Sequence, residues 1–199
     1  IAIADGKDDA NSFATLNVTS DKATTVNVTG AGDLNLTTTS SVLTKVDATN
    51  MTGALTYTAT VNSVTVNGGQ AVDSLTANAD DVKLNGGAGN DTLTVNAGAD
   101  RAILDGGLGN DTFVIAGAAS TSSTYANILS VNAGDVIDFT GATSFAATKV
   151  TLSAGATETT QALMDLAVNN LASNQMGWFQ TGGNTFIVMD TDGNNTFNG

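Results

Sequence analysis

The sequence predicts an all-β fold, a right-handed parallel β-solenoid with a small C-terminal cap of one helix and one β-hairpin. Three observations lead to this prediction. Segments of four or five residues with alternating apolar and polar side chains start every seven to eleven residues from Thr15 to Thr112, with one double gap around Ala102. Gly, Asp and Asn are frequent in the turns between these segments. Segments this close together leave no room for the crossover helices of a βαβ fold.

The regular period distinguishes between two all-β architectures. A β-meander or sandwich would use strands of similar length, but a fixed period favours a solenoid in which each coil stacks on the one before. A coil of two strands and two turns takes about eighteen to twenty residues, and neighbouring coils lie about 4.8 Å apart, so residues 12–116 would form about five coils. The predicted inward-facing residues are Leu16, Val18, Val26, Val28, Leu34, Leu36, Val64, Val66, Leu93, Val95, Phe113 and Ile115.

The rhythm of short strands stops after Ile115, which predicts two regions. Residues 1–116 would form the solenoid, with glycine-rich repeats at 68–114, and residues 117–199 would form a C-terminal capping region. Within that region, Ile128–Phe139 is predicted to be one further strand-turn-strand. Such a cap would cover a coil that has no neighbour.

A helix and a hairpin are predicted at the C-terminal end. Leu163, Leu166 and Leu171 follow the 3.6-residue period, which predicts a helix over 158–172 with Thr157 as its N-cap. Residues 177–189 alternate around Thr181-Gly182-Gly183, a pattern typical of a β-hairpin.

Composition excludes several classes of function. The chain has 199 residues, no Cys and no His, which removes disulfides, zinc sites with nitrogen or sulfur ligands and any His-activated nucleophile, so we expect no enzyme. A net charge of −13 argues against nucleic acid and anionic lipid as partners. No run of eighteen apolar residues is present, so no membrane insertion is expected. The chain begins at Ile1 without Met, which predicts a larger parent protein.

The pattern G-G-x-G-x-D occurs twice, at Gly86–Asp91 and Gly106–Asp111, and a degraded copy begins at Gly68 and keeps Asp73. Glycines allow positive φ and bring backbone carbonyls together, and the aspartate adds a carboxylate. Ca²⁺ takes about six to eight oxygen ligands, more than one such turn offers, so two turns on neighbouring coils would share each ion. Mg²⁺ holds its water more tightly and is a weaker candidate.

Electrostatics supports a cation in this column of turns. Two carboxylates one coil apart repel by about 0.9 kcal/mol in water and about 3.5 kcal/mol at an effective dielectric constant of 20. The alternative is a tight glycine turn without a metal. The predicted calcium-site residues are Gly68, Asp73, Gly86, Gly87, Gly89, Asn90, Asp91, Gly106, Gly107, Gly109, Asn110 and Asp111. On the opposite edge Asp81 and Asp100 are further candidates, and Arg101 is expected to be a surface residue.

The segments GGAGNDTLT and GGLGNDTFV resemble the nonapeptide G-G-x-G-x-D-x-U-x of RTX proteins, which bacteria secrete by the type I route. This resemblance implies a calcium-bound parallel β-roll. The Thr, Ala, Asn and Val richness of residues 12–66 resembles the C-terminal half of RTX-type bacterial surface-layer proteins, although these residues lack the glycine-rich turns.

The resemblance implies a calcium-dependent structural segment of a secreted surface-layer protein that assembles with copies of itself into a two-dimensional lattice on the bacterial cell surface. A polysaccharide of that surface could bind a part of the parent protein outside this chain. The alternative is a calcium-dependent adhesin segment or polysaccharide-binding module. An enzyme ranks third, because neither H-E-x-x-H nor G-x-S-x-G is present.

Overall fold

The computed structural model of the chain describes residues 2–3, 14–116, 126–142, 144–146, 149–150, 160–169 and 171–189. The chain divides into two compact units. The first comprises Ile1–Ala116 with Ala126–Asp138, and the second comprises Gly117–Tyr125 with Phe139–Gly199. The glycine-rich repeats at 68–114 lie in the first unit.

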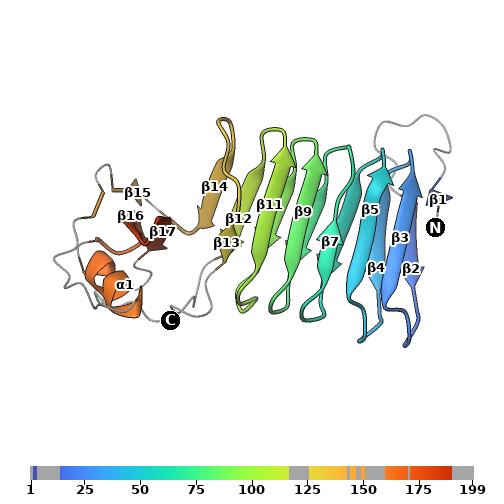
Figure 1. Cartoon of the computed structure of the whole chain (residues 1–199), viewed down its shortest axis with the longest axis horizontal. Helices are drawn as coiled ribbons and strands as arrows, with labels where there is room; N and C mark the ends of the chain where they lie inside the picture. Colours follow the sequence, from blue (N-terminus) through green and yellow to red (C-terminus); the bar gives the residue numbers. More distant parts are fainter. Residues whose placement is uncertain are drawn as a thin grey trace. The chain divides into compact units, whose positions relative to one another are not determined.

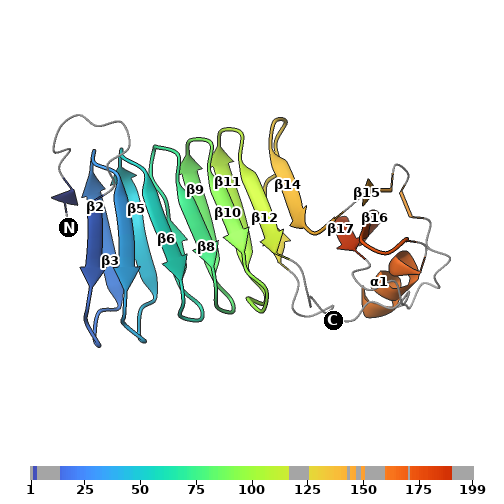
Figure 2. The ribbon, with the colours of Figure 1, turned by 180° about the vertical axis from the view of Figure 1, so that it is seen from behind.

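Within the described residues, the first unit is built from two seven-stranded sheets (Figures 1 and 2). The odd sheet contains, in spatial order, β1 (Ala2–Ile3), β3 (Thr25–Gly30), β5 (Lys45–Met51), β7 (Thr65–Asn67), β9 (Lys83–Ala88), β11 (Ile103–Leu108) and β13 (Asn127–Ile128). The even sheet contains β2 (Ala14–Val18), β4 (Leu34–Thr38), β6 (Leu55–Ala59), β8 (Ser74–Ala77), β10 (Thr92–Val95), β12 (Thr112–Ala116) and β14 (Val136–Thr140). The chain passes from one sheet to the other at every turn.

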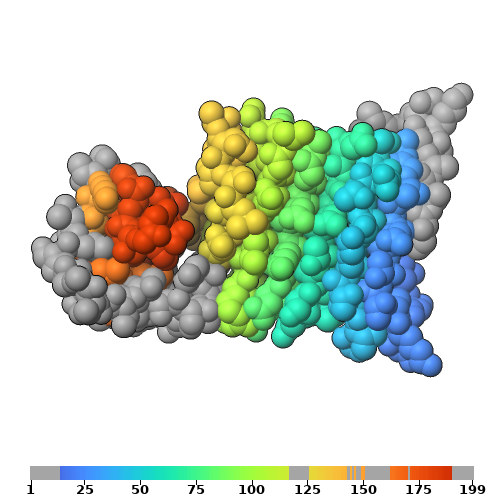
Figure 3. Space-filling model, viewed as in Figure 1, coloured from blue at the N-terminus to red at the C-terminus, as the bar shows by residue number. Residues whose placement is uncertain are grey.

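Neighbouring strands pair in parallel, with one register shift between β3 and β5 at Asn27–Thr29, and this pairing confirms the predicted parallel β-solenoid. Across the odd sheet the paired residues are Val46, Val66, Leu84, Leu104 and Ile128, so successive coils take 20, 18, 20 and 24 residues. Figure 3 shows the coils as successive bands across one face of the first unit. The longest step contains the segment between β12 and β13, and it keeps the register of the sheet.

The core lies between the two sheets and consists of apolar side chains from alternate strand positions. All twelve residues predicted to face inward belong to this core or pack against it, with Leu16, Val18 and Ile115 partly buried. Successive side chains of a strand point to opposite faces, so the same alternation leaves threonine and asparagine outside. Burial of the apolar faces is therefore the main stabilising contribution along the whole roll.

The predicted strand-turn-strand around residues 128–139 lies in the first unit up to Asp138. Its strands, β13 and β14, extend the odd and even sheets by one coil. They are therefore continuous with the solenoid rather than a separate cover for it.

The second unit contains a short helix and a small sheet. Helix α1 (Thr160–Val168) ends four residues before the predicted end at 172, and its predicted start at 158 and expected N-cap, Thr157, lie outside the described residues. The predicted hairpin is formed by β16 (Gln175–Thr181) and β17 (Asn184–Met189), which pair antiparallel. The strand β15 (Ser144–Phe145), which the sequence does not predict, pairs in parallel with β16.

A separate apolar core holds the second unit together. It contains Val150, Leu163, Met164, Ala167, Val168, Leu171, Phe179 and Val188. The rings of Phe179 and Phe186 stack across the hairpin with centroids 5.1 Å apart. No helix in the described ranges is both long enough and apolar enough to cross a membrane.

Candidate calcium site

The turns that lead from the odd sheet to the even sheet form one edge of the roll, called here the aspartate edge. Asp73, Asp91, Asp111 and Asp135 end four successive turns of this edge. The pairing of β8, β10 and β12 keeps the first three in one column, and each is only 1% exposed. A column of buried carboxylates is unusual, because a buried charge is costly unless it is paired.

One carboxylate oxygen of each aspartate binds the backbone of the coil before it. The N–H groups of Leu55, Asp73, Asp91 and Asp111 donate to Oδ1 of Asp73, Asp91, Asp111 and Asp135, at 2.6, 2.7, 2.9 and 2.8 Å respectively. Hydrogen bonds from backbone N–H groups favour the ionised carboxylate. Asp91 therefore bridges the turns before and after its own.

The second carboxylate oxygen is satisfied at the two ends of the column. Oδ2 of Asp73 accepts the Gly69 N–H at 2.6 Å, and Oδ2 of Asp135 accepts the Asn132 N–H at 2.6 Å. Both donors belong to the same turn as the acceptor. These two outer turns therefore close on themselves.

The second carboxylate oxygen is unsatisfied in the two inner turns. Oδ2 of Asp91 and Oδ2 of Asp111 are buried, and neither has a hydrogen-bond partner among the described residues. Burial raises the pKa of Asp91 to about 6, with smaller contributions from the charges of Asp73 and Asp111. Burial also raises the pKa of Asp73. Both shifts are due mainly to burial, which makes the ionised form of these carboxylates costly unless a positive charge compensates it.

The first glycine of each turn packs closely against this carboxylate. A Cβ added at Gly86 would meet Oδ2 of Asp91 and, at 2.5 Å, the carbonyl oxygen of Gly106 on the next coil. A Cβ added at Gly106 would meet Oδ2 of Asp111. A carboxylate oxygen and a carbonyl oxygen from adjacent coils thus approach the same point beside Gly86. Oxygens converging in this way are the ligands that Ca²⁺ takes.

The second and third glycines of each turn are required by the backbone. Gly87 and Gly107 have φ of +109° and +96°, and Gly89 and Gly109 have φ of +130° and +137°. Side chains are disfavoured at such angles. In addition, a Cβ on Gly107 would collide with the carbonyl oxygen of Gly87, one coil earlier. These glycines therefore allow close stacking of the turns, and Gly107 pairs with Gly87 in the sheet.

The asparagines at position five link the turns at the surface. The Asn110 N–H donates to Oδ1 of Asn90 at 3.0 Å, and this contact is exposed. Asn90 and Asn110 therefore hold successive turns in register, and their predicted role in calcium binding stays a prediction.

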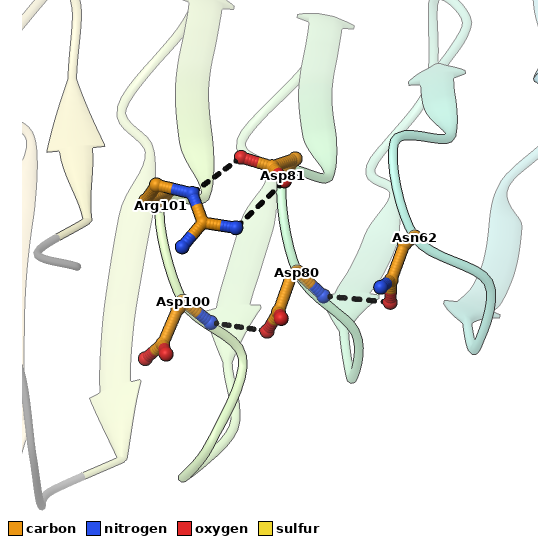
Figure 4. A network of polar contacts seen from close by, with 5 residues as sticks. All are labelled: Asn62, Asp80, Asp81, Asp100 and Arg101. Carbon is orange, nitrogen blue, oxygen red and sulfur yellow. Dashed lines mark hydrogen bonds and ion pairs between the residues drawn. The ribbon is translucent and has the colours of Figure 1, made fainter.

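The opposite edge has a different chemistry (Figure 4). Both carboxylate oxygens of Asp81 accept hydrogen bonds from Arg101, at 2.7 and 2.8 Å. The Asp100 N–H donates to Oδ1 of Asp80, and the Asp80 N–H donates to Oδ1 of Asn62, at 3.0 and 3.2 Å. Asp81 is thus occupied by an ion pair, with Arg101 at the surface as expected. Neither Asp81 nor Asp100 belongs to the aspartate edge.

The oxygen atoms near the column indicate which ligands an ion would have. Among the residues that the structure describes, no three acidic side chains converge on one point. Backbone carbonyls would therefore have to supply most of the ligands. The glycine-rich turns bring such carbonyls into the column, so the residues present fit a hard cation.

Asp135 was not predicted as a site residue because its turn lacks the glycine pattern. The offset could have identified it: seven residues separate Leu84 from Asp91 and Leu104 from Asp111, and seven also separate Ile128 from Asp135. The turn has the same length and a different sequence.

The family model of the RTX calcium-binding nonapeptide repeat matches residues 67–102 and 103–114. Repeats of this family bind calcium, so Ca²⁺ is the cofactor that the matched residues imply. No curated protein and no solved structure is significantly similar to the chain.

Proposed function

We propose that the turns Gly86–Asp91 and Gly106–Asp111 hold a calcium ion between them, and that this ion stabilises the roll. The observation that carries the proposal is Oδ2 of Asp91, which is buried, has no hydrogen-bond partner among the described residues and lies close to the carbonyl oxygen of Gly106. The ion would supply the missing positive charge. Its role would be structural, because a roll of such repeats is a structural, non-catalytic fold.

A weaker site is proposed between Gly68–Asp73 and Gly86–Asp91. A Cβ added at Gly68 would meet both Oδ2 of Asp73 and the carbonyl oxygen of Gly86, so the same two kinds of oxygen face each other. However, Oδ2 of Asp73 already accepts the Gly69 N–H. An ion there would have to compete with that hydrogen bond, so we expect lower affinity than at Asp91.

The test is a calcium titration by isothermal calorimetry of the full chain and two variants. Asp91→Asn keeps the shape of the side chain and removes its charge, so we expect it to lose at least one ion per chain. Asp33→Asn is the matched control, because Asp33 lies in an earlier turn of the same edge and its Oδ1 already accepts the Ala54 N–H. Equal calcium binding by wild type and Asp91→Asn would contradict the proposal.

For the parent protein we propose assembly into a calcium-dependent surface-layer lattice. The even sheet contains no charged residue from β2 to β12, although the net charge of the chain is −13. Its outward column consists of Thr15, Asn35, Thr56, Ser74, Thr92 and Thr112. A neutral, straight face can meet a second copy without the like-charge repulsion that the acidic turns would impose.

Electron microscopy of the parent protein in millimolar calcium tests this assembly role. The double change Asp91→Ala and Asp111→Ala should abolish ordered sheets and leave the protein secreted. Normal lattices from this variant would contradict the proposal. If wild type forms no sheets and is retained on alginate or another glycan only when calcium is present, the binding-module alternative is correct.

The proposed location is outside the cell, after type I secretion. Proteins with these repeats are typically secreted. Extracellular calcium modules bind with dissociation constants of about 10⁻⁴–10⁻³ M, so the turns would remain empty in a calcium-poor cytoplasm and fill after export. Export could then precede completion of the roll.

A further inference from the structure

The last aspartate of the matched repeats, Asp111, has an unsatisfied carboxylate oxygen although no further glycine-rich motif follows it. Asp111 is 1% exposed, and its Oδ2 has no hydrogen-bond partner in the described part of the chain. The family match ends at residue 114, so nothing in the repeat pattern supplies a second turn for this oxygen. The next coil has to supply it.

Residues 130–135 form a turn that stacks on Gly106–Asp111. The Val136 N–H donates to the carbonyl of Asp111, and the Asp111 N–H donates to Oδ1 of Asp135, both at 2.8 Å. On the strand side of the turn, the Leu129 N–H donates to the carbonyl of Leu104 at 2.9 Å. The stacking is therefore in register on both sides of the turn.

The approach of the two turns is close. Gly134 has φ of +107°, and a Cβ added there would collide with the side-chain oxygen of Asn110. Within the turn, the Asn132 N–H donates to Oδ2 of Asp135, and the Asp135 N–H donates to the Asn132 carbonyl, at 2.6 and 3.1 Å. Asp135 therefore uses one oxygen to shape its own turn and the other to hold the coil before it.

We propose that a further calcium ion binds between Gly106–Asp111 and residues 130–135, a site that rests on the calcium binding proposed above. Oδ2 of Asp111 would be its carboxylate ligand, just as Oδ2 of Asp91 is one coil earlier. The register of the odd sheet aligns Ser130 with Gly106, just as it aligns Gly106 with Gly86 one coil earlier. The carbonyls of the 130–135 turn complete the site, and Asp135 positions that turn.

This ion joins a coil without the repeat motif to the coils that carry it. Ala126–Asp138 belongs to the first unit, but it is separated along the chain from β12 by residues 117–125. Calcium at Asp111 thus fixes the last coil onto the roll.

Calcium stoichiometry of the full chain, measured by calorimetry and native mass spectrometry, tests this site. Asp111→Asn keeps the side-chain shape, and Asp135→Ala removes the acceptor that holds Asp111. Each is expected to bind one ion fewer than wild type. Asp138→Ala is the matched control: it makes the same charge change on the exposed face of β14 and should bind as many ions as wild type.

Each possible result bears on the proposal. Wild-type calcium stoichiometry in Asp111→Asn overturns this further site. If Asp91→Asn still binds one ion fewer in that case, the calcium binding proposed for the repeats stands. A wild type that binds no calcium overturns both. Because Asp135→Ala could unfold the last coil, circular dichroism in calcium accompanies the titration; a folded Asp135→Ala variant with wild-type stoichiometry also overturns the site.

Discussion

The N-terminal and C-terminal coils of the roll place opposite chemistry at the same buried position. In the C-terminal coils this position is occupied by Asp73, Asp91 and Asp111. Strand pairing aligns Leu55 and Leu34 with these aspartates in the two preceding coils. Leu34 and Leu55 are fully buried, and the aspartates are only 1% exposed. The register of the sheet thus holds a side chain inside whatever its polarity.

The N-terminal coils satisfy their polar groups without an ion. Oδ1 of Asp33 accepts the Ala54 N–H at 2.7 Å, and the Ser40 hydroxyl donates to the carbonyl of Ala23 at 2.7 Å. The buried Tyr57 hydroxyl bonds Thr38 at 2.9 Å. In the C-terminal coils, by contrast, two buried carboxylate oxygens have no hydrogen-bond partner within the part of the chain that the structure describes. We therefore expect calcium to stabilise one half of the roll and to leave the other half largely unaffected.

The largest expected effect is that of calcium removal. With excess EGTA, amide hydrogen exchange measured by mass spectrometry should accelerate strongly in the coils from Gly68 to Asp135, because their carboxylates repel each other and lack a counter-charge. The coils from Ala14 to Asn67 should retain most of their protection, since each coil of a solenoid contacts only its neighbours. Equal acceleration in both halves, or none in either, would show that the halves do not differ in this way.

A core truncation in each half sharpens the contrast. Leu34→Ala and Leu93→Ala each remove a fully buried side chain and should destabilise their coils by about 2–5 kcal/mol. Calcium at a hundred times its dissociation constant contributes about 2.7 kcal/mol, so it should restore much of the stability of Leu93→Ala. Urea unfolding with and without calcium measures this, and an equal gain for Leu34→Ala would argue against the difference.

A methyl group beside the proposed ion should have a smaller and local effect. Gly86→Ala directs a Cβ at the Asp91 carboxylate and the Gly106 carbonyl, so calcium affinity should fall at least tenfold. The control is Gly98→Ala: Gly98 has φ of +83° and open space around it, so only backbone strain of about 1–2 kcal/mol is expected. If both variants bind calcium as wild type does, the volume beside Gly86 is not an ion site.

The smallest effect is expected on the edge opposite the aspartates. Asp81→Asn weakens an exposed ion pair with Arg101, so stability should change little and calcium stoichiometry should stay the same. Calorimetric titration checks this. Loss of an ion in Asp81→Asn would extend calcium binding to that edge and remove the contrast between the two edges.

The sequence alone predicts the architecture of the roll and the centre of its site. Strand spacing, alternate apolar positions such as Leu93 and Phe113, and the glycine offsets at Gly86 and Gly106 are local patterns. Each follows from backbone geometry within one coil, where side chains alternate and only glycine tolerates the turn. For this reason the solenoid, the inward-facing residues and the stacking of the two perfect motifs were predictable.

Only the tertiary structure decides how each aspartate is used. Oδ2 of Asp73 accepts the Gly69 N–H, whereas Oδ2 of Asp111 has no hydrogen-bond partner in the described ranges. Asp81 pairs with Arg101, and Asp135 joins the column from a turn without the motif. These contacts join residues of different coils or depend on how neighbouring coils pack against each turn. The stacking register determines these contacts, because hydrogen bonds between coils align residues that are far apart in the sequence. No local sequence pattern identifies such pairs.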